Sequence, residues 1–325
     1  MPDILISENI QGAGVDALRA RFDVSLQPEL WKSSARLAKE ISNCRALMVR
    51  NQTPVTAELL ACAPQLLVVG RAGVGLDNID VKAAERAGIV IAFTPDQNAI
   101  SAAELTMGMI LALARMIPAA DHDTRQGNWS RQKFVGIELY GKTLGIVGAG
   151  KIGFLTARRA IAFGMKILAY DPYLSPDNVL LSDLRAELVS LDELLSGADV
   201  VSCHLPATRE TKGLMNGARF AKMKPGALFV NTSRGSVVAE PDLVQAIKSG
   251  ALGGAALDVR ATEPPPLTEL EALPNVILTP HIAAFTHEAQ DRVTRAVCGD
   301  VARVLDGKPA INAVGCAIPR KPAAK

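Results

Sequence analysis

The chain has 325 residues, 49% of them apolar, which is enough for about two domains that each bury a hydrophobic core. Its formal net charge of +2 is spread along the chain without a basic block, and only 4% of the residues are aromatic. This composition argues against a phosphate-following groove or a base-stacking surface, so we predict no nucleic-acid partner. The four histidines lack the spacing of metal ligands, and we predict no bound metal.

The start of the chain and the cysteines bear on the cellular compartment. Residues 1–7 carry Asp3 within an apolar stretch and show neither a cationic start nor a small-residue cleavage site, so they predict a strand and not a signal peptide. The most apolar segment, residues 105–117, contains Arg115 and is shorter than the roughly 20 residues that cross a bilayer. The five cysteines are widely spaced, as in reduced proteins. We expect a cytoplasmic protein without membrane contact.

Short apolar strands alternate with helical stretches over the first part of the chain. Strands are predicted at residues 4–6, 46–49, 66–69 and 89–93. Such alternation is typical of a parallel sheet with helices on both faces. A glycine-rich loop at residues 70–75 follows the third strand, but no helix begins at once and no acid ends the next strand. We interpret this loop as part of a substrate site.

Residues 101–116 have the pattern of a long apolar helix. Ser101 precedes Glu104 by three residues, which is the spacing of an N-terminal capping box. We therefore predict that the helix begins at Ser101. Because it lies between two groups of strands, we expect it to connect two domains.

A second glycine motif follows that helix, in the run Leu144-Gly-Ile-Val-Gly148-Ala-Gly150-Lys-Ile-Gly153. Gly148 permits a tight turn, Gly150 lets the backbone approach a pyrophosphate, and Gly153 lets the following helix pack closely on the strand. Asp171 ends the next strand, about 20 residues on, where an acid accepts hydrogen bonds from the adenosine ribose and repels a 2'-phosphate. These features predict a nicotinamide dinucleotide site that prefers NAD to NADP.

Six strands continue the alternation, at residues 144–147, 167–170, 200–203, 227–230, 255–258 and 276–278. Three reactive side chains come just after such strands, where open parallel sheets bind ligands. Arg234 offers a planar fork that binds a carboxylate through two bonds, and Glu263 precedes a stiff run of prolines. His281 is suited to moving protons near neutral pH. With a hydride-transferring cofactor, these groups predict a dehydrogenase site.

After the last strand, residues 288–305 form a second long helical pattern that ends at Gly307. We expect this helix to return to the first domain and to make that domain discontinuous. The predicted fold class is α/β, with two doubly wound parallel-sheet domains. They are a Rossmann cofactor domain at residues 100–286 and a flavodoxin-like substrate domain at residues 1–99 and 287–325.

Several longer strings point to a known family. They are Val69-Gly-Arg71-Ala-Gly73-Val-Gly75-Leu-Asp77-Asn-Ile-Asp80, Asn98-Ala-Ile-Ser-Ala-Ala-Glu104-Leu-Thr, the glycine motif with Tyr170-Asp171-Pro172, His204-Leu-Pro206-Ala-Thr208, Asn231-Thr-Ser-Arg234-Gly235, Asp258-Val-Arg-Ala-Thr-Glu263-Pro-Pro and Pro280-His281-Ile. Over nearly its whole length the chain resembles the D-isomer-specific 2-hydroxyacid dehydrogenases. Within that family it is most similar to the phosphoglycerate dehydrogenase branch, in a short form without regulatory domains.

The resemblance implies roles for individual residues. Arg234 is implied as the substrate anchor, Glu263 as the partner of the histidine, and His281 as the acid–base group. Substrate contacts are implied for Arg50, Arg71, Val74, Gly75 and Arg234. Cofactor contacts are implied for Gly148, Gly150, Lys151, Ile152, Gly153, Asp171, His204, Pro206, Thr211, Thr232, Ser233, Asp258 and His281. The resemblance also implies a homodimer formed through the cofactor domains.

The chain departs from the pattern of that branch at three places. Val74 stands where threonine is common, and Arg260 stands where an aromatic residue is usual. After His281, the segment up to Thr286 includes Phe285, where small residues and a serine are typical. The changes near the substrate loop reduce hydrogen-bonding capacity, which bears on whether the substrate carries a phosphate.

Three functions remain open at this point. The first is an NAD-dependent dehydrogenase of the phosphoglycerate dehydrogenase kind, which moves hydride reversibly between C2 of a 2-hydroxy acid and nicotinamide. The second has the same chemistry, as a hydroxypyruvate, glyoxylate or other 2-keto acid reductase. The third is an NAD-sensing binding protein in which catalysis is incidental. The set of Arg234, Glu263 and His281 favours an enzyme with a small 2-hydroxy or 2-keto acid as substrate.

Overall fold

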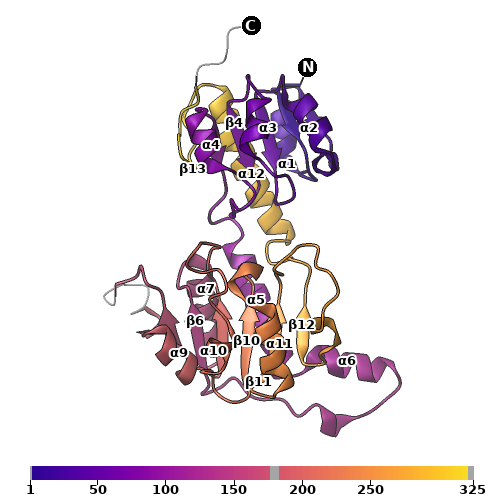
Figure 1. The fold of residues 1–325 in the computed structure, drawn as a ribbon, viewed down its shortest axis with the longest axis vertical. Helices are drawn as coiled ribbons and strands as arrows, with labels where there is room; N and C mark the ends of the chain where they lie inside the picture. The colour runs from indigo at the N-terminus through magenta and orange to yellow at the C-terminus, as the bar shows by residue number, and fades with distance from the viewer. Residues whose placement is uncertain (1, 176–182, 321–325) are drawn as a thin grey trace. The chain divides into compact units, whose positions relative to one another are not determined.

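The computed structural model describes residues 2–175 and 183–320 of the chain. The chain divides into two compact units (Figure 1). Unit 1 comprises Met1–Asn98 and Phe285–Lys325, so both ends of the chain build it, and unit 2 comprises Ala99–Ala284. Each unit has its own sheet with apolar clusters on both faces. This arrangement confirms the predicted α/β class with two parallel-sheet domains.

The sheet of unit 1 has its strands in the order β13-β5-β4-β3-β1-β2. Their bounds are β1 (Ile4–Ile6), β2 (Val24–Leu26), β3 (Ala46–Val49), β4 (Val68–Arg71), β5 (Val90–Ala92) and β13 (Ala313–Val314). Neighbours among β1 to β5 pair in parallel, and β13 pairs antiparallel with β5. Every residue of β1, β3 and β5 is buried, as expected for strands that are covered on both faces.

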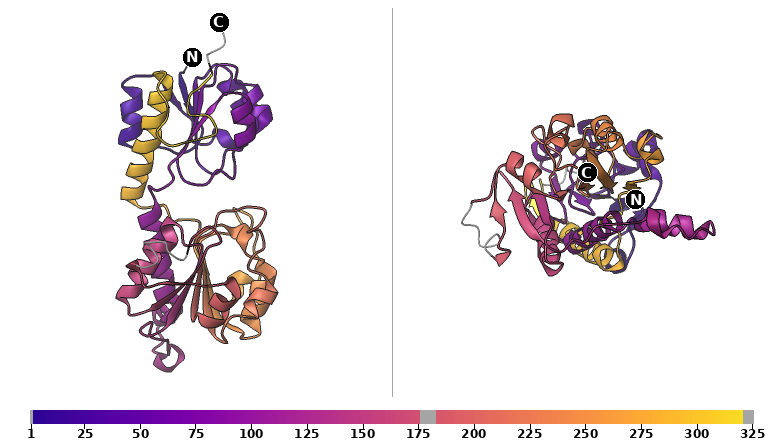
Figure 2. Two further views of the ribbon diagram at one scale, coloured as in Figure 1. Left: turned by 90° about the vertical axis from the view of Figure 1, so that its left-hand side faces the viewer. Right: turned by 90° about the horizontal axis from the view of Figure 1, so that it is seen from below.

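Helices cover both faces of this sheet (Figure 2). The face that carries Ile4 and Ile6 packs against α1 (Ala13–Arg19) and α12 (His287–Leu305). The face that carries Leu5 packs against α2 (Ser34–Ile41), α3 (Ala57–Ala61) and α4 (Val81–Arg86). Successive side chains of a strand point to opposite faces, and β1 therefore supplies both apolar clusters. The long helix predicted at residues 288–305 is present as α12, and it ends as expected just before Gly307.

The sheet of unit 2 is parallel throughout, in the order β12-β11-β10-β9-β6-β7-β8. Its strands are β6 (Thr143–Val147), β7 (Lys166–Tyr170), β8 (Glu187–Leu188), β9 (Val200–Cys203), β10 (Ala227–Asn231), β11 (Leu252–Leu257) and β12 (Val276–Leu278). One face packs against α5 (Ala99–Ala114) and α7 (Lys151–Ala162). The other packs against α9 (Leu191–Gly197), α10 (Gly217–Phe220) and α11 (Glu240–Lys248). The doubly wound order places the carboxyl ends of β9 to β12 side by side.

The remaining helical segments are short or lie at the margin of a unit. Helix α6 (Ile117–Arg125) follows α5 after a bend of 62° at Met116, and it extends away from the sheet of unit 2 (Figure 1). Single 3-10 turns occur at Leu30–Lys32, Arg131–Lys133, Gly235–Val237 and Leu270–Ala272.

The predicted start of α5 is wrong. The helix begins at Ala99, two residues before Ser101, and Ser101 is buried within its first turn. Glu104 does not complete a capping box, because its Oε1 accepts a hydrogen bond from Arg159 Nη2 at 2.9 Å. The whole helix belongs to unit 2, where it packs on α7, β10 and β11. The expected connecting helix is therefore a core element of one unit.

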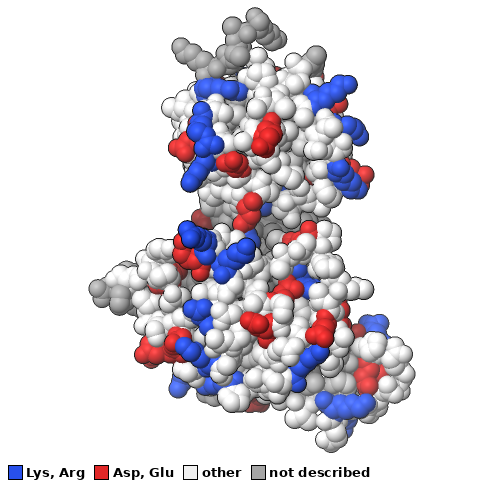
Figure 3. Space-filling view, viewed as in Figure 1, with Lys and Arg blue, Asp and Glu red and all other residues white. Residues whose placement is uncertain are grey.

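Among the described residues, no single helix is long and apolar enough to cross a bilayer, and α5 with α6 reaches that length and composition only as a bent pair. Ten residues of α5 are buried within unit 2. On the face shown in Figure 3, Lys and Arg side chains lie among Asp and Glu side chains.

Candidate active site

The glycine motif forms the turn between β6 and α7. Gly148 has a φ of 94°, a conformation that L side chains rarely adopt. A Cβ atom at Gly153 would lie 2.3 Å from the carbonyl oxygen of Gly148, so only glycine lets α7 start this close to the strand. At Gly150, the N-cap of α7, a Cβ atom would meet no neighbouring atom within 4 Å. The motif thus combines tight packing on one side with open space at the helix N-terminus, which is the geometry that a pyrophosphate needs.

Asp171 is held beside this turn. It follows β7, and its Oδ2 accepts a hydrogen bond from the backbone N–H of Ala149 at 3.1 Å. Its Oδ1 accepts another from the N–H of Tyr173 at 3.0 Å. The carboxylate therefore has a defined position at the glycine turn, where its charge disfavours a second phosphate group. Lys151 and Ile152 form the first turn of α7 beside it.

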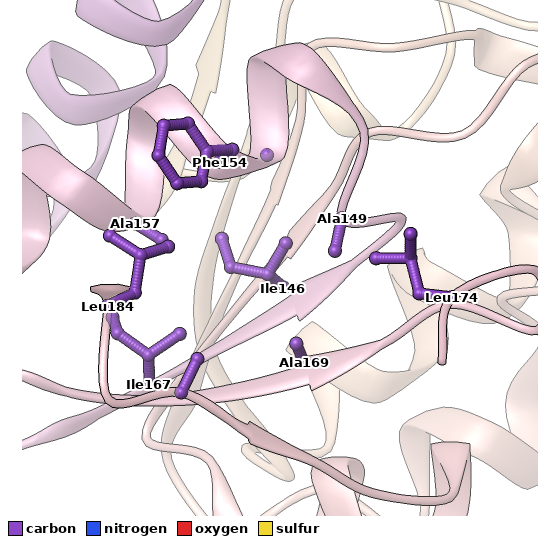
Figure 4. Close-up of a pocket in the computed structure, with 10 residues that line it drawn as sticks. Ile146, Ala149, Phe154, Ala157, Ile167, Ala169, Leu174 and Leu184 are labelled. Atoms are coloured by element: carbon purple, nitrogen blue, oxygen red, sulfur yellow. The ribbon is translucent and has the colours of Figure 1, made fainter. Parts of the chain in front are cut away.

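A small apolar pocket lies under the glycine motif, between α7 and the strands β6 and β7 (Figure 4). Its lining consists of Ile146, Ala149, Gly153, Phe154, Ala157, Ile167, Ala169, Leu174, Leu184 and Ala186. None of these side chains can donate or accept a hydrogen bond. The pocket is therefore part of the packing beneath the motif, and the groups expected to bind a polar ligand lie outside it, at the N-terminus of α7 and at Asp171.

Three of the predicted residues lie in loops that follow three neighbouring strands of unit 2. Arg234 follows β10, Glu263 follows β11 and His281 follows β12. His281 Nδ1 lies 2.7 Å from Glu263 Oε2, and both side chains are about one-third exposed, at 35% and 31%. This bond occupies Nδ1 and leaves Nε2 as the nitrogen that can exchange a proton with a ligand.

The charge on Glu263 is maintained by its surroundings. Burial alone would raise the pKa of its carboxyl group, but the hydrogen bond and charge of His281 act to lower it. The backbone N–H of Arg260 and the positive charge of Arg234 act in the same direction, and the pKa of Glu263 lies below its ordinary value. Glu263 is thus a carboxylate at neutral pH and stabilises positive charge on the imidazole ring.

Asp258 holds the loop that carries His281. It is fully buried, its Oδ1 accepts hydrogen bonds from Thr279 Oγ1 at 2.6 Å and the N–H of Ile282 at 2.9 Å, and its Oδ2 accepts from the N–H of Ala283 at 2.9 Å. The backbone N–H of His281 donates to the Asp258 carbonyl oxygen at 2.8 Å. Burial raises the pKa of Asp258 although these hydrogen bonds oppose that shift. Sequence reasoning missed Thr279, which only its position two residues before His281 could have indicated.

His281 itself has a φ of 55°, in the left-handed region that is uncommon for residues other than glycine. Hydrogen bonds from Thr279, His281, Ile282 and Ala283 to Asp258 hold the backbone on both sides of His281. An uncommon backbone conformation persists where surrounding contacts fix it in this way. The imidazole is therefore presented to Glu263 by a fixed backbone.

Arg234 lies at the end of a loop that Asn231 organises. Asn231 Oδ1 accepts from Ser233 Oγ at 2.7 Å, and its Nδ2 donates to the carbonyl oxygen of Arg234 at 2.9 Å. Arg234 Nη1 donates to the carbonyl oxygen of Ser233 at 2.7 Å. Thr232 Oγ1 lies 2.8 Å from Thr106 Oγ1 and ties the loop to α5. The expected cofactor contacts of Thr232 and Ser233 stay predictions, since the Thr232 hydroxyl contacts α5 and the Ser233 hydroxyl donates to Asn231.

The loop after β9 carries the other expected cofactor residues. His204 Nε2 lies 3.0 Å from Ser202 Oγ, and burial lowers the pKa of His204 to about 3, which makes it neutral. Thr211 Oγ1 donates to the carbonyl oxygen of Pro206 at 2.6 Å. This loop therefore offers uncharged polar groups at the same edge of the sheet, and its predicted cofactor contacts stay predictions.

The expected substrate residues Arg50, Arg71, Val74 and Gly75 belong to unit 1, not to the unit that contains His281. The Arg50 guanidinium is hydrogen-bonded to Gln290 Oε1 and lies 5.5 Å from the centre of the Phe285 ring, and burial lowers its pKa. Arg71 Nη1 donates to the carbonyl oxygen of Ala72 at 2.9 Å. Their roles toward a substrate stay predictions.

Comparison with known protein families covers most of unit 2. Residues 107–283 match a family described as D-isomer specific 2-hydroxyacid dehydrogenase, NAD binding domain. The D-3-phosphoglycerate dehydrogenase of Archaeoglobus fulgidus is 43% identical over 312 residues, and that of Synechocystis sp. is 45% identical over 314 residues. These matches cover 96% and 97% of this chain, but 59% and 56% of the relatives. The chain thus spans a little over half the length of the curated relatives that it matches.

Solved structures resemble the chain along nearly its full length. The TT0316 protein from Thermus thermophilus has a TM-score of 0.90 and 35% identity, over 96% of this chain and 99% of that chain. A glyoxylate reductase from Paecilomyes thermophila has a TM-score of 0.88 and 31% identity, over 96% and 97%. A D-lactate dehydrogenase from Aquifex aeolicus, complexed with NAD and lactic acid, has a TM-score of 0.86 and 30% identity, over 96% and 99%.

Proposed function

Because the chain belongs to the D-isomer-specific 2-hydroxyacid dehydrogenase family and contains its NAD-binding domain, we propose that it is an NAD-dependent oxidoreductase acting on the CH–OH group of a 2-hydroxy acid. The observation that carries this proposal is the 2.7 Å contact between His281 Nδ1 and Glu263 Oε2, beside Arg234, in the unit with the glycine motif. An acid–base group, its carboxylate partner and a carboxylate-binding fork are the groups that this reaction requires.

His281 moves the proton of the reaction. In the direction of oxidation, its Nε2 takes the proton of the 2-hydroxyl group while Nδ1 remains bonded to Glu263. NAD, when bound, would supply the acceptor for the C2 hydride, so that the substrate would leave as a 2-keto acid. In the direction of reduction, the protonated imidazole returns its proton to the keto oxygen. The negative charge of Glu263 stabilises the imidazolium that exists between these events.

Arg234 binds the 1-carboxylate of the substrate through its planar fork. The loop held by Asn231 limits where this fork can lie, and a substrate held at its carboxylate keeps C2 in one orientation. Glycine packing at Gly153 and the fixed charge of Asp171 support binding of NAD at the other end of the site.

Two classes of substrate are candidates for this reaction. Similarity to D-3-phosphoglycerate dehydrogenases favours a phosphorylated hydroxy acid. The similarity to a glyoxylate reductase along nearly the full length of both chains favours a short 2-keto acid without phosphate. Arg50, a cation expected to contact the substrate, already donates to Gln290 through Nη2 and lies against the Phe285 ring, and this also favours the substrate without phosphate.

Oxidation of NADH in the presence of glyoxylate, hydroxypyruvate, phosphohydroxypyruvate and longer keto acids tests the proposal. We expect turnover with at least one of them by the wild-type protein, and loss of that turnover in His281→Gln. Tight NADH binding without turnover of any of these acids would overturn the proposal that the protein is an enzyme and would favour an NAD-sensing binding protein.

We further propose a homodimer formed through unit 2. The segment from α6 to β6 exposes large apolar side chains, with Trp129 and Tyr140 each 80% exposed and Val135 75% exposed. Exposed apolar groups of this size mark association surfaces in many proteins. A molar mass near 34.3 kDa by light scattering at micromolar concentration would contradict the dimer.

A cytoplasmic location is our remaining proposal. The five cysteines are free thiols, and Cys44, Cys203 and Cys298 are buried. Thiols that persist without disulfides are typical of a reducing compartment. Fractionation of cells that express the full-length protein checks this assignment, and recovery from an oxidising compartment would contradict it.

A further inference from the structure

Arg260 is a buried cation in the loop between β11 and Glu263. Its side chain is only 7% exposed, and two carboxylates surround its guanidinium group. Nε and Nη2 donate to Glu240 Oε1 and Oε2 at 3.2 and 3.0 Å, and Nη1 donates to Glu271 Oε1 at 2.6 Å. Nη2 also donates to Thr268 Oγ1 at 3.2 Å. A guanidinium fork can bridge two carboxylates in this way, whereas an aromatic side chain at this position could not.

The same carboxylates hold the backbone on both sides of Glu263. Glu240, the first residue of α11, accepts the N–H of Ala261 on Oε1 at 2.7 Å. Glu271 Oε2 accepts the N–H and the hydroxyl of Thr268 at 2.7 and 2.8 Å. The hydrogen bond from Arg260 lowers the pKa of Glu271 to about 2, so this carboxylate stays charged. The segment from residue 260 to residue 271 is thus closed into a loop by the Arg260 side chain.

The backbone of Arg260 contacts Glu263 in its own loop and Gly235 in the loop after β10. Its N–H donates to Glu263 Oε1 at 3.2 Å, on the carboxylate whose other oxygen bonds His281. Its carbonyl oxygen lies against Gly235, where an added Cβ atom would come within 1.9 Å of it. Gly235 directly follows Arg234. The position of the Arg260 backbone therefore sets the direction of the Glu263 carboxylate, and the lack of a side chain at Gly235 leaves room for it.

We infer that Arg260 is a positioning residue for the proposed dehydrogenase reaction, and that its ion pairs with Glu240 and Glu271 fix the Glu263 carboxylate against His281. The inference rests on the proposed function. Arg260 itself makes no contact with His281 in the described structure and acts through Glu263. Its expected effect is on turnover, because misplacement of a catalytic group by about 1 Å can cost up to a hundredfold in rate.

Three proteins separate this role from a general loss of stability. Arg260→Met removes the cation and leaves two carboxylates without it. Arg260→Met combined with Glu240→Gln and Glu271→Gln also removes the two unpaired negative charges. This triple variant folds even if those charges prevent Arg260→Met from folding. Lys248→Met is the matched control, because Lys248 pairs with Glu269 at 2.9 Å in the same region and both groups are exposed. Thermal unfolding is measured for each.

A double-mutant cycle with Glu263→Gln tests the mechanism of the effect. We expect Arg260→Met and the triple variant to lower kcat at least about tenfold, with KM for NADH unchanged within about twofold. In the Glu263→Gln background, the same changes lower kcat by less than about twofold, because the carboxylate that Arg260 positions is already absent. The inference would be overturned if the reductions in kcat from the Arg260 and Glu263 changes multiplied when combined. It would also be overturned if Arg260→Met kept the kcat of the wild type.

A measurement without turnover separates the failure of this inference from failure of the proposed function. Carbon-13 NMR of glutamate-labelled protein follows the titration of the Glu263 carboxyl group, which Glu263→Gln assigns. Since bonds from His281 and the Arg260 backbone lower the pKa of Glu263, we expect its titration midpoint to move upward in Arg260→Met and not in Lys248→Met. An unchanged midpoint overturns the positioning role. Absence of turnover by the wild type with an upward shift would overturn only the proposed function.

Discussion

The Glu263 carboxylate and the His281 imidazole are 18 residues apart in the sequence and 2.7 Å apart in the structure. Their loops follow β11 and β12, which are neighbours in the sheet of unit 2. Asp258, at the end of β11, accepts hydrogen bonds from the loop after β12 and joins the two loops directly. The contact is therefore a product of strand order and of one buried carboxylate.

Replacement of His281 by glutamine removes the proton carrier and keeps a hydrogen-bonding side chain. We expect kcat to fall by about a hundredfold to ten-thousandfold, which is the usual contribution of general acid–base catalysis. Binding of NADH, measured by its fluorescence, changes little. The exposed His287, which has no proposed role in the site, provides a control, and we expect His287→Gln to leave kcat unchanged. Equal turnover by the two variants would remove His281 from the mechanism.

The role of Arg234 is tested by Arg234→Lys, which retains the charge but loses the planar fork. We expect kcat/KM for the keto acid to fall about tenfold to a hundredfold, since hydrogen bonds to charged groups contribute about 1.5–3 kcal/mol. The dissociation constant of NADH stays within about twofold. Steady-state kinetics and NADH titration measure both, with the exposed Arg209→Lys as control. A change confined to NADH affinity contradicts the assignment.

Two glycines of the nucleotide motif respond differently to the same substitution. Gly153→Ala places a Cβ atom 2.3 Å from a backbone oxygen, so we expect a lower thermal unfolding temperature together with weaker NADH binding. Gly150→Ala meets no neighbouring atom within 4 Å and has a φ of −66°, so stability is retained. Its methyl group occupies the space for the pyrophosphate, and NADH affinity falls at least about tenfold. Calorimetry and NADH titration check both variants. Wild-type affinity in Gly150→Ala would place the pyrophosphate elsewhere.

The ion pair of Glu271 gives stability a pH dependence of known sign. The pKa of Glu271 is about 2 in the folded chain and 4.5 ordinarily, so its contribution is complete above pH 4.5 and is lost as the pH falls toward 2. Glu271→Gln should therefore be less stable than wild type at neutral pH, and this difference should narrow below pH 4.5. Urea denaturation measures the free energy of unfolding across this range. A difference that stays constant down to pH 2 would show that charge is not its cause.

The sequence allowed the main strands and the nucleotide motif to be predicted. Continuous apolar runs such as Ala46–Val49, which is wholly buried, indicate a strand clearly. The edge strands β2, β8 and β13, in contrast, were not predicted. Those strands have two or three residues and are largely not buried, so their apolar signal is weak. The start of α5 was misplaced because the spacing of a capping box also occurs inside helices. Here Ser101 is buried and Glu104 bonds Arg159, so neither side chain caps the helix.

Within the candidate site, the position of a residue after a strand was predictable and its hydrogen-bond partners were not. Arg234, Glu263 and His281 each follow a strand, and parallel strand order brings their loops to one edge of the sheet. The partners of Arg260 lie 20 and 11 residues away, in α11 and after the prolines. No local pattern connects acids at such distances to one arginine, and only the folded loop does so.

The return of α12 to unit 1 has a consequence for synthesis on the ribosome. Helix α12 packs against α1 and β4, and β13 completes the sheet beside β5, although more than two hundred residues separate each pair in the chain. On the sheet made from the first ninety or so residues, the part of one apolar face that α12 covers therefore stays exposed while all of unit 2 is being translated. Nascent chains stalled before residue 285 should engage holdase chaperones through that face, and those released beyond residue 314 should not.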